Sequence, residues 1–208
     1  MDNMIFYRGS AFPLQTPQTP KILSNEPLLE ASKYIQLRQV KFEENGAIKT
    51  WDIAKSHDSV AILLYDFKMK GFIFVRQFRV SVYLKNAADG YMYELCAGLC
   101  DKEGKSVTEI ALEELQEECG YFIESNRLES VGEFYSSVGM NGAKLSLFYA
   151  AICDDDRKGK GGGNASENEN IETIFVPNSL IFEFLKDKKC PKSQSLCYAV
   201  MWYEMNKK

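Results

Sequence analysis

The chain has 208 residues, of which 45% are hydrophobic and 12% aromatic, and its formal net charge is −4. This composition suits one folded domain with a short extension and excludes global disorder. The acidic balance argues against nucleic acid as a partner, because nucleic-acid-binding proteins usually carry a basic surface. The apolar runs are too short to span a bilayer, and the N-terminus lacks a secretory pattern. We therefore expect a cytoplasmic protein that does not bind membranes.

The chain contains six cysteines, none in a Cys-x-x-Cys pair, and a single histidine, His57. We interpret the cysteines as free thiols that are mostly buried, and the pattern disfavours a disulfide framework or a cysteine zinc site. One histidine cannot build a multi-histidine zinc site. Any chemistry must therefore come from carboxylates, hydroxyls, basic groups or a bound metal.

The N-terminal 33 residues are weakly patterned. Residues 16–20 contain two prolines, which remove backbone donors and fix φ. We predict an extended arm there.

Two strands are predicted next, at residues 34–43 and 48–54. Asn45-Gly46 lies between them and is a strong signal for a hairpin turn. In the first strand the apolar positions change phase, which predicts a β-bulge near Gln39.

Six further segments are rich in β-branched, aliphatic and aromatic residues and are predicted as strands. They lie at residues 60–65, 71–77, 91–95, 129–135, 145–153 and 171–176. The first two are separated by a short polar turn and predict a second hairpin.

The apolar period changes to steps of mostly three and four from Val107, which predicts a helix of about 13 residues. Ser106 is placed to cap its start, with Glu109 three residues later as a capping box requires. Gly120 is placed to end it.

A glycine-rich polar segment at residues 154–170 predicts a long surface loop, of a length that is usually functional or disordered. Two more helices are predicted at residues 178–186 and 193–206. The order of strands, helix, strands and helices indicates a single α/β or α+β domain.

Four glutamates fall within six positions of the first helix, at Glu113, Glu114, Glu117 and Glu118. The last three can converge on one side because they are three and four residues apart. A divalent cation would offset their repulsion, and Mg²⁺ prefers oxygen ligands while leaving room for phosphates. A solvated acidic helix face is the other interpretation of this spacing.

The segment resembles the Nudix box, which consists of a glycine, a loop with a glutamate, a spacer, and Arg-Glu-aliphatic-x-Glu-Glu-x-Gly-aliphatic. The matching residues are Gly98, Glu114, Leu115, Glu117, Glu118 and Gly120. Tyr121 replaces the final aliphatic residue.

The segment also departs from that pattern. The loop is one residue longer than usual, and its glutamate position falls near Gly104 or Lys105, with Glu103 as a substitute. Glu113 stands where the family has the arginine that orients a metal-binding glutamate. This replacement keeps open a binding domain that does not cleave its ligand.

Matches outside the box resemble the UDP-sugar diphosphatase subgroup of the family, and the similarity covers roughly residues 34–200. They lie at residues 50–52, 57–60, 77–79, 94–98, 137–139 and 161–163. Residues 136–139 lack the proline that ADP-ribose enzymes often carry downstream of the box, which favours a sugar nucleotide.

The resemblance implies a Nudix α/β/α sandwich with a mixed sheet. Residues 1–54 would form an N-terminal arm and strands that assist a homodimer, and residues 55–208 the hydrolase domain. The implied metal ligands for Mg²⁺ or Mn²⁺ are Ala97 through its carbonyl, Glu114, Glu117, Glu118 and Glu169. Glu167 and Glu118 would be catalytic, with Glu167 as the base. The implied substrate contacts are Arg79, Glu94 and Gly139.

Two arginines, Arg76 and Arg79, lie three apart on a predicted strand and face opposite sides, so only one is expected at the site. We favour Arg79, which lies in a family motif, against the alternative of a surface charge. His57 is interpreted as structural, and Trp51 as a core or interface residue rather than a base-stacking one.

The implied reaction is metal-dependent hydrolysis of a UDP-glucose-like nucleotide sugar to UMP and a sugar 1-phosphate. Three alternatives stay open. They are an ADP-ribose pyrophosphatase, a nucleotide-sugar-binding domain without catalysis, and a structural role in a larger assembly.

Overall fold

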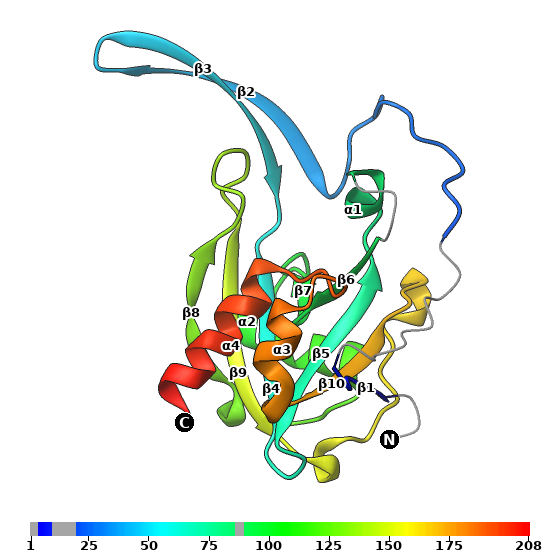
Figure 1. The fold of residues 1–208 in the computed structure, drawn as a ribbon. Helices are drawn as coiled ribbons and strands as arrows, with labels where there is room; N and C mark the ends of the chain where they lie inside the picture. Colours follow the sequence, from blue (N-terminus) through cyan, green and yellow to red (C-terminus); the bar gives the residue numbers. More distant parts are fainter. Residues whose placement is uncertain (1–3, 10–19, 86–89) are drawn as a thin grey trace.

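The computed structural model describes residues 4–9, 20–85 and 90–208, so the arm predicted at residues 16–20 lies outside the described residues except for Pro20. An eight-stranded mixed sheet forms the body, and a separate two-stranded hairpin extends from it (Figure 1). Its main path runs β1 (Met4–Phe6), β10 (Glu172–Pro177), β5 (Gly71–Phe78), β4 (Ser59–Asp66), β9 (Lys144–Ile152) and β8 (Glu129–Tyr135). β6 (Tyr91–Glu94) pairs with β5, and β7 (Cys96–Leu99) pairs with β4. The β1–β10 and β4–β9 pairs are parallel, which makes the sheet mixed.

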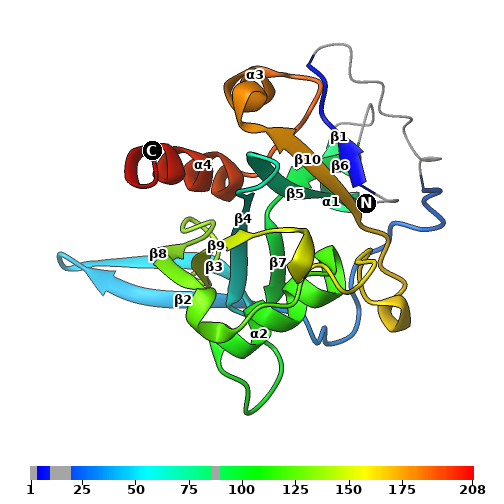
Figure 2. The same ribbon diagram turned by 90° about the horizontal axis from the view of Figure 1, so that it is seen from below.

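Helices cover both faces of this sheet, as Figure 2 shows. One face carries α2 (Val107–Glu114) and the π-helical turn η1 (Leu115–Cys119) that continues it. The other carries α3 (Ile181–Lys186) and α4 (Gln194–Asn206). The remaining helices are short: α1 (Val80–Lys85), η2 (Ser125–Arg127), η3 (Asp154–Asp156), η4 (Ala165–Glu167) and η5 (Asn178–Leu180).

Strand β4 shows how the sequence builds two cores, because successive side chains of a strand point to opposite faces. Val60 and Ile62 are fully buried in the cluster that contains the α2 side chain Ile110. Ala61 and Leu63 are buried in the cluster that contains residues of α3 and α4. The predicted α/β/α sandwich is confirmed.

The predicted hairpin forms from β2 (Ile35–Glu44) and β3 (Ala47–Ser56), with Asn45 and Gly46 both at positive φ in the turn. The bulge predicted near Gln39 is wrong, since Gln39 pairs with Asp52 in an unbroken register. All of β2 and most of β3 are exposed, so no buried face forces the apolar positions back into phase.

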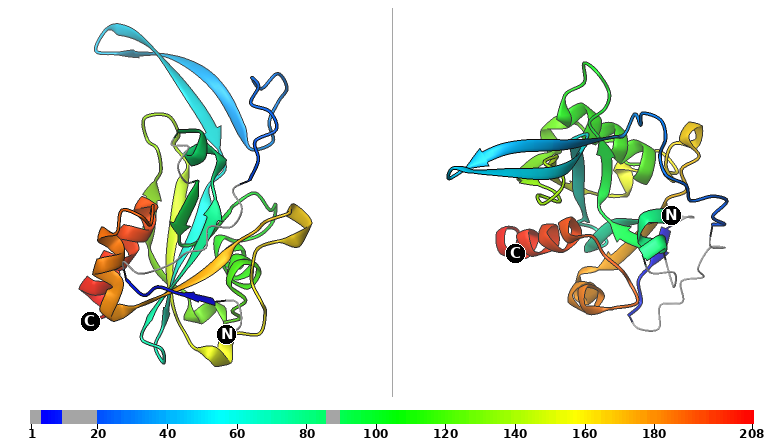
Figure 3. Two further views of the ribbon diagram at one scale, coloured as in Figure 1. Left: turned by 45° about the vertical axis from the view of Figure 1, so that its right-hand side comes forward. Right: turned by 90° about the horizontal axis from the view of Figure 1, so that it is seen from above.

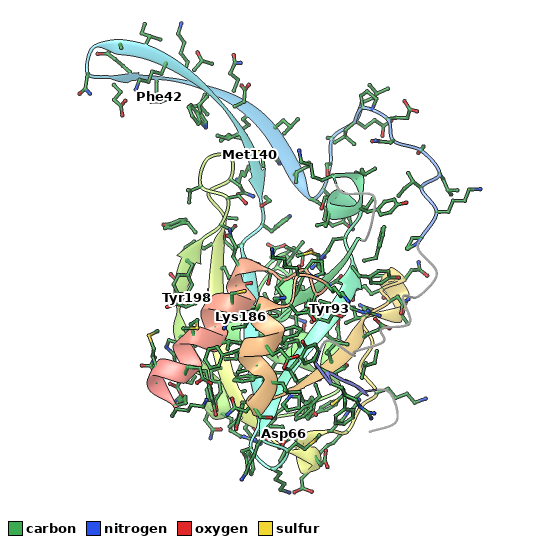
Figure 4. The ribbon with its side chains drawn as sticks, viewed as in Figure 1. Phe42, Asp66, Tyr93, Met140, Lys186 and Tyr198 are labelled. Carbon is green, nitrogen blue, oxygen red and sulfur yellow. The ribbon has the colours of Figure 1, made fainter. Side chains whose placement is uncertain are left out.

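This hairpin projects away from the sandwich in every view (Figure 3). At its base, the Trp51 Nε1–H donates to the Gly139 carbonyl at 2.8 Å, and the Ala54 N–H donates to the Met140 carbonyl at 2.9 Å. Figure 4 shows Met140 in the loop beside the hairpin base and Phe42 far from the body. The β8–β9 loop therefore anchors the hairpin at its foot.

Several boundaries differ from the sequence prediction. The strand predicted at residues 91–95 is divided between β6 and β7, because Leu95 is where the chain crosses from pairing with β5 to pairing with β4. The helix from Val107 ends at Gly120 (φ 74°) as predicted, but its last turn is π-helical. β1 and α1 were not predicted. β1 lies in the main sheet, so residues 1–54 include a strand of the body.

Within the described residues, no helix is both long and apolar enough to traverse a bilayer.

The predicted capping box at Ser106 is present, with its hydroxyl accepting the Glu109 N–H and the Glu109 carboxylate accepting the Ser106 N–H. We expect Ser106→Ala to lower the free energy of unfolding by about 1 kcal/mol, because an N-terminal backbone donor of α2 loses its partner. Urea titration measures the change. Ser106→Asp, which keeps a capping oxygen, should stay near the wild type, and equal losses in both variants would contradict the capping role.

Candidate active site

A cavity of about 560 Å³ opens where β4, β5, β6 and β7 meet the end of α2. Among the predicted site residues, those that line it are Arg79, Glu94, Ala97, Glu114, Glu117, Glu118, Glu167 and Glu169. Gly139 does not line it and instead accepts the hydrogen bond from Trp51 at the foot of the hairpin. The structure thus gathers residues that are up to 90 positions apart in the chain, Arg79 and Glu169.

Glu118 is the buried carboxylate of the site, with only 2% of the residue exposed. One of its oxygens accepts the Ala97 N–H at 3.0 Å. Burial raises the pKa of Glu118 to about 8, and the Ala97 hydrogen bond only partly opposes this shift. The π-helical turn widens the helix at this point, a deviation that frequently occurs at functional sites.

Glu114 lies one turn earlier, against the backbone of β7. A Cβ placed on Gly98 would lie 2.1 Å from Glu114 Cδ, so glycine at position 98 lets the Glu114 side chain lie against β7, and a larger residue would make that side chain turn away. Burial raises the pKa of Glu114 to about 7. The Lys102 charge opposes this rise, and Glu117, Glu169 and Glu167 add to it.

The glycine loop of residues 161–163 docks on the end of η1. Gly162 and Gly163 donate their N–H groups to the carbonyls of Glu118 and Glu117 at 2.9 and 3.0 Å. Gly161 has φ +66°, and a Cβ there would lie 2.5 Å from the Glu118 carbonyl. The predicted surface loop is therefore tied to the helix that carries the glutamates.

This docking brings two acids of the loop to the cavity. Glu167 ends η4, and Glu169 accepts the Asn164 N–H at 2.9 Å. Both are exposed, in contrast to Glu118. The carboxylates of the site therefore range from buried to freely solvated.

Of the two arginines on the β5 segment, Arg79 lines the cavity and Arg76 does not. The Arg79 Nη2 lies 2.7 Å from Glu94 Oε2, so the two predicted substrate contacts form an ion pair. Arg76 is buried, pairs with Glu172 at 2.5 Å and lies over the Tyr91 ring. Arg76 therefore has a structural role.

Position 113 lies just outside the cavity lining. The Glu113 carboxylate accepts hydrogen bonds from Lys102 Nζ at 3.0 Å and from Lys105 Nζ at 2.5 Å. These bonds lower the pKa of Glu113, with Lys105 contributing most. Glu103 does not line the cavity, whereas Lys102 does.

Sequence reasoning missed several lining residues, notably Lys33, Tyr34, Lys102 and Ser195. Ser193, which also lines the cavity, caps α4, and its place before an apolar helical pattern was a usable signal. No local pattern marks Lys33 or Tyr34, because they reach the cavity only through the path of the chain before β2.

The donor set suits a hard divalent ion, since it consists of carboxylate oxygens with a backbone carbonyl at Ala97. The pKa values of two of these carboxylates, Glu114 and Glu118, are raised by burial, and few positive charges lie near them. A bound cation would supply that positive charge. Across the part of the chain that the structure describes, no three acidic, histidine or cysteine side chains already stand together as a preformed metal cluster. Metal binding would therefore require rotation of the glutamate side chains.

The sequence was compared with family models and with curated proteins. No family model matches it. It is 34% identical to the uridine diphosphate glucose pyrophosphatase of Bos taurus over 198 residues, which cover 83% of this chain and 89% of the relative. The protein of the same name from Mus musculus is 33% identical with the same coverage. A GDP-mannose pyrophosphatase of Cronobacter sakazakii is 36% identical over 126 residues, 61% of this chain and 63% of the relative.

A mixed sheet between helices, with a glutamate-bearing helix over a cavity, is the architecture expected of a Nudix hydrolase. The extent of the match to the two mammalian pyrophosphatases shows that the chain belongs to the Nudix family. The resemblance found in the sequence is thereby confirmed, and the chain is an enzyme.

The raised pKa values of Glu114 and Glu118 predict how the metal-free fold responds to pH. Their ordinary value is 4.5, and their folded values are about 7 and about 8. The folded state therefore binds more protons than the unfolded state in this range. The stability that these groups contribute is full below pH 4.5 and is lost as the pH rises through their folded pKa values.

In EDTA we expect the melting temperature to fall as the pH rises from 4.5 to 8. The free energy of unfolding should decrease by an amount of the order of 2 kcal/mol over this range. Differential scanning calorimetry measures the fall. Glu118→Gln cannot ionise and should flatten it, whereas Glu124→Gln, at an exposed glutamate outside the cavity, should not. An unchanged slope in Glu118→Gln would assign the titration to another group.

Proposed function

We propose that this Nudix enzyme hydrolyses the diphosphate of a UDP-glucose-like nucleotide sugar, with Mg²⁺ or Mn²⁺, to UMP and a sugar 1-phosphate. The observation that carries the proposal is one cavity that holds Glu114, Glu117 and Glu118 together with loop acids and Arg79. The names of the relatives add nucleotide sugars as the substrate class.

The bound ion would polarise a phosphoryl oxygen and lower the pKa of the attacking water. Glu114, Glu117, Glu118 and Glu169 are the residues that would hold it, with the Ala97 carbonyl. The Ala97 N–H fixes the Glu118 carboxylate.

Glu167 is our proposed general base. It is exposed on η4 at the cavity, so its carboxylate is accessible to a water molecule from which it can accept a proton. Its loop is held to η1 through the hydrogen bonds of Gly162 and Gly163, which supports a role for Glu167 close to the glutamates of that turn.

Arg79 is our proposed diphosphate ligand, because a guanidinium forms paired hydrogen bonds with phosphate oxygens. Its ion pair with Glu94 holds it at the cavity before substrate binds. Glu94 would then accept hydrogen bonds from substrate hydroxyls when Arg79 turns to phosphate. Gly139 lies in the β8–β9 loop, outside the cavity of its own chain. Its proposed substrate contact would therefore be made in the cavity of a second chain.

We also propose a homodimer. The hairpin exposes large apolar side chains, with Leu37 76% exposed and Ile48 68% exposed, and a two-stranded hairpin has little stability in isolation. A second copy would cover this surface. The proposed cytoplasmic location is supported by six cysteines that are all free thiols, as expected in a reducing compartment.

GDP-mannose is the second candidate substrate, because a GDP-mannose pyrophosphatase matches 61% of the chain. The test is release of nucleoside monophosphate from UDP-glucose, UDP-galactose, GDP-mannose, ADP-glucose and ADP-ribose, with Mg²⁺ and with EDTA. We expect metal-dependent UMP release from UDP-glucose to lead. A preference for another member of the panel would correct the substrate, and cleavage of none would overturn the proposal.

Glu118→Gln should lower kcat by roughly 100-fold or more without loss of the fold, because it removes the charge of a buried ligand. The matched control is Glu124→Gln, which should retain wild-type kcat. Circular dichroism and the melting temperature establish folding of both variants. Wild-type turnover in folded Glu118→Gln would remove Glu118 from the metal site.

Leu37→Lys should shift the protein from dimer to monomer, because it places a charge in the proposed apolar interface. Light scattering after size exclusion measures the mass. The control is Met205→Lys, at a side chain that is 70% exposed near the C-terminal end of α4. That end of α4 lies away from the hairpin in Figure 1, so the variant should leave the dimer intact. A wild-type protein of monomer mass would contradict the homodimer.

A further inference from the structure

Lys102 is a cation beside the proposed metal ligands, and it is shared between two carboxylates. Its ammonium lies 3.0 Å from Glu113 and 3.9 Å from Glu117. Lys102 and Glu117 line the cavity, whereas Glu113 does not. The nearer partner thus lies outside the cavity and the farther one inside it.

The position of this ammonium affects any cation that enters. Lys102 is close enough to oppose the rise in the pKa of Glu114, so its field reaches the carboxylates of the cavity. An ammonium centred on Glu117 would occupy a coordination position and repel a divalent ion. An ammonium held on Glu113 leaves Glu117 available.

Glu113 has the geometry to hold Lys102 in this way. Its second oxygen accepts from Lys105 Nζ at 2.5 Å, so both oxygens of the carboxylate are engaged by lysines of the loop. An arginine at position 113 would repel both lysines and drive Lys102 toward Glu117. The departure of position 113 from the Nudix pattern and the presence of Lys102 in the loop therefore belong together.

We propose that Glu113 is a positioning residue that holds the Lys102 ammonium beside the metal-ligating carboxylates and prevents it from occupying Glu117. The inference rests on the proposed function in one respect, the assignment of Glu117 as a metal ligand. It adds a specific dependence: the effect of Glu113 on metal binding is exerted through Lys102.

The experiment measures Mn²⁺ binding to the substrate-free full chain by electron paramagnetic resonance. The variants are Glu113→Gln, Lys102→Met and the double variant. Glu113→Gln should raise the Kd for Mn²⁺ about fivefold, since the released ammonium competes at Glu117. Lys102→Met should not raise the Kd, and Glu113→Gln should have no further effect in the Lys102→Met background.

Lys105→Met is the matched control, because Lys105 binds the same carboxylate but does not line the cavity. It should change the Kd by less than about twofold. Melting temperatures in EDTA establish that all four variants fold, as expected for side chains that are partly exposed.

A wild-type Kd in Glu113→Gln would overturn the inference. It would also be overturned if Glu113→Gln weakened Mn²⁺ binding as much in the Lys102→Met background as in the wild type. A wild-type protein that binds no Mn²⁺ would overturn it together with the metal assignment. If the wild type binds Mn²⁺ but cleaves no nucleotide sugar, the proposed function fails while the binding cycle still decides the role of Glu113.

Discussion

The burial of the Glu118 carboxylate beneath β7 is the constraint on which the rest of the site depends. The residue is 2% exposed, and a backbone N–H from Ala97 is the main group that favours its charged form. A buried carboxylate with so little compensation is costly to ionise. The sandwich supplies the burial through its packed strands and helices, and the open cavity beside it would give a cation access to the carboxylate.

Close backbone approach is the second element of this design. Glycine at position 98 lets Glu114 lie on β7, and glycine at position 161 lets the loop lie on the Glu118 carbonyl. A Cβ at position 161 would collide with the backbone of Glu118 and Cys119, and a Cβ at position 98 would displace the Glu114 side chain, so β7 and the glycine loop both lie close against one helix end. The backbone that carries the glutamates is therefore held on a rigid frame, while their side chains can still rotate toward a ligand.

Patterns that depend on burial or on local hydrogen bonding could be predicted from the sequence. The alternation in β4 follows from two covered faces, and the capping box at Ser106 needs only local residues. The family pattern located the glutamates of the cavity. The prediction of a bulge at Gln39 was wrong because the hairpin is exposed, and no core requires its apolar side chains to lie on one face.

Other features could not be predicted because they depend on distant parts of the chain. Lys33 and Tyr34 reach the cavity through the route taken before β2, and the split at Leu95 depends on which strand is adjacent at each residue. The link between Lys102 and Glu113 spans a loop whose length departs from the family pattern. Which residues pair across it depends on how the loop before α2 folds back toward Glu113 near the end of that helix.

The docking of the glycine loop has a consequence for how this sequence can change over time. Gly159, Gly162 and Gly163 donate in turn to carbonyls at the end of the glutamate helix, so the loop is registered against that helix residue by residue. The number of residues between these anchors and Glu169 therefore sets where the loop acid lies. Exposed side chains between Gly163 and Glu169 can be replaced without loss of these anchors. A single insertion or deletion there would displace Glu169 from the cavity. Between the anchoring glycines and Glu169, the number of residues is therefore constrained more tightly than their identity.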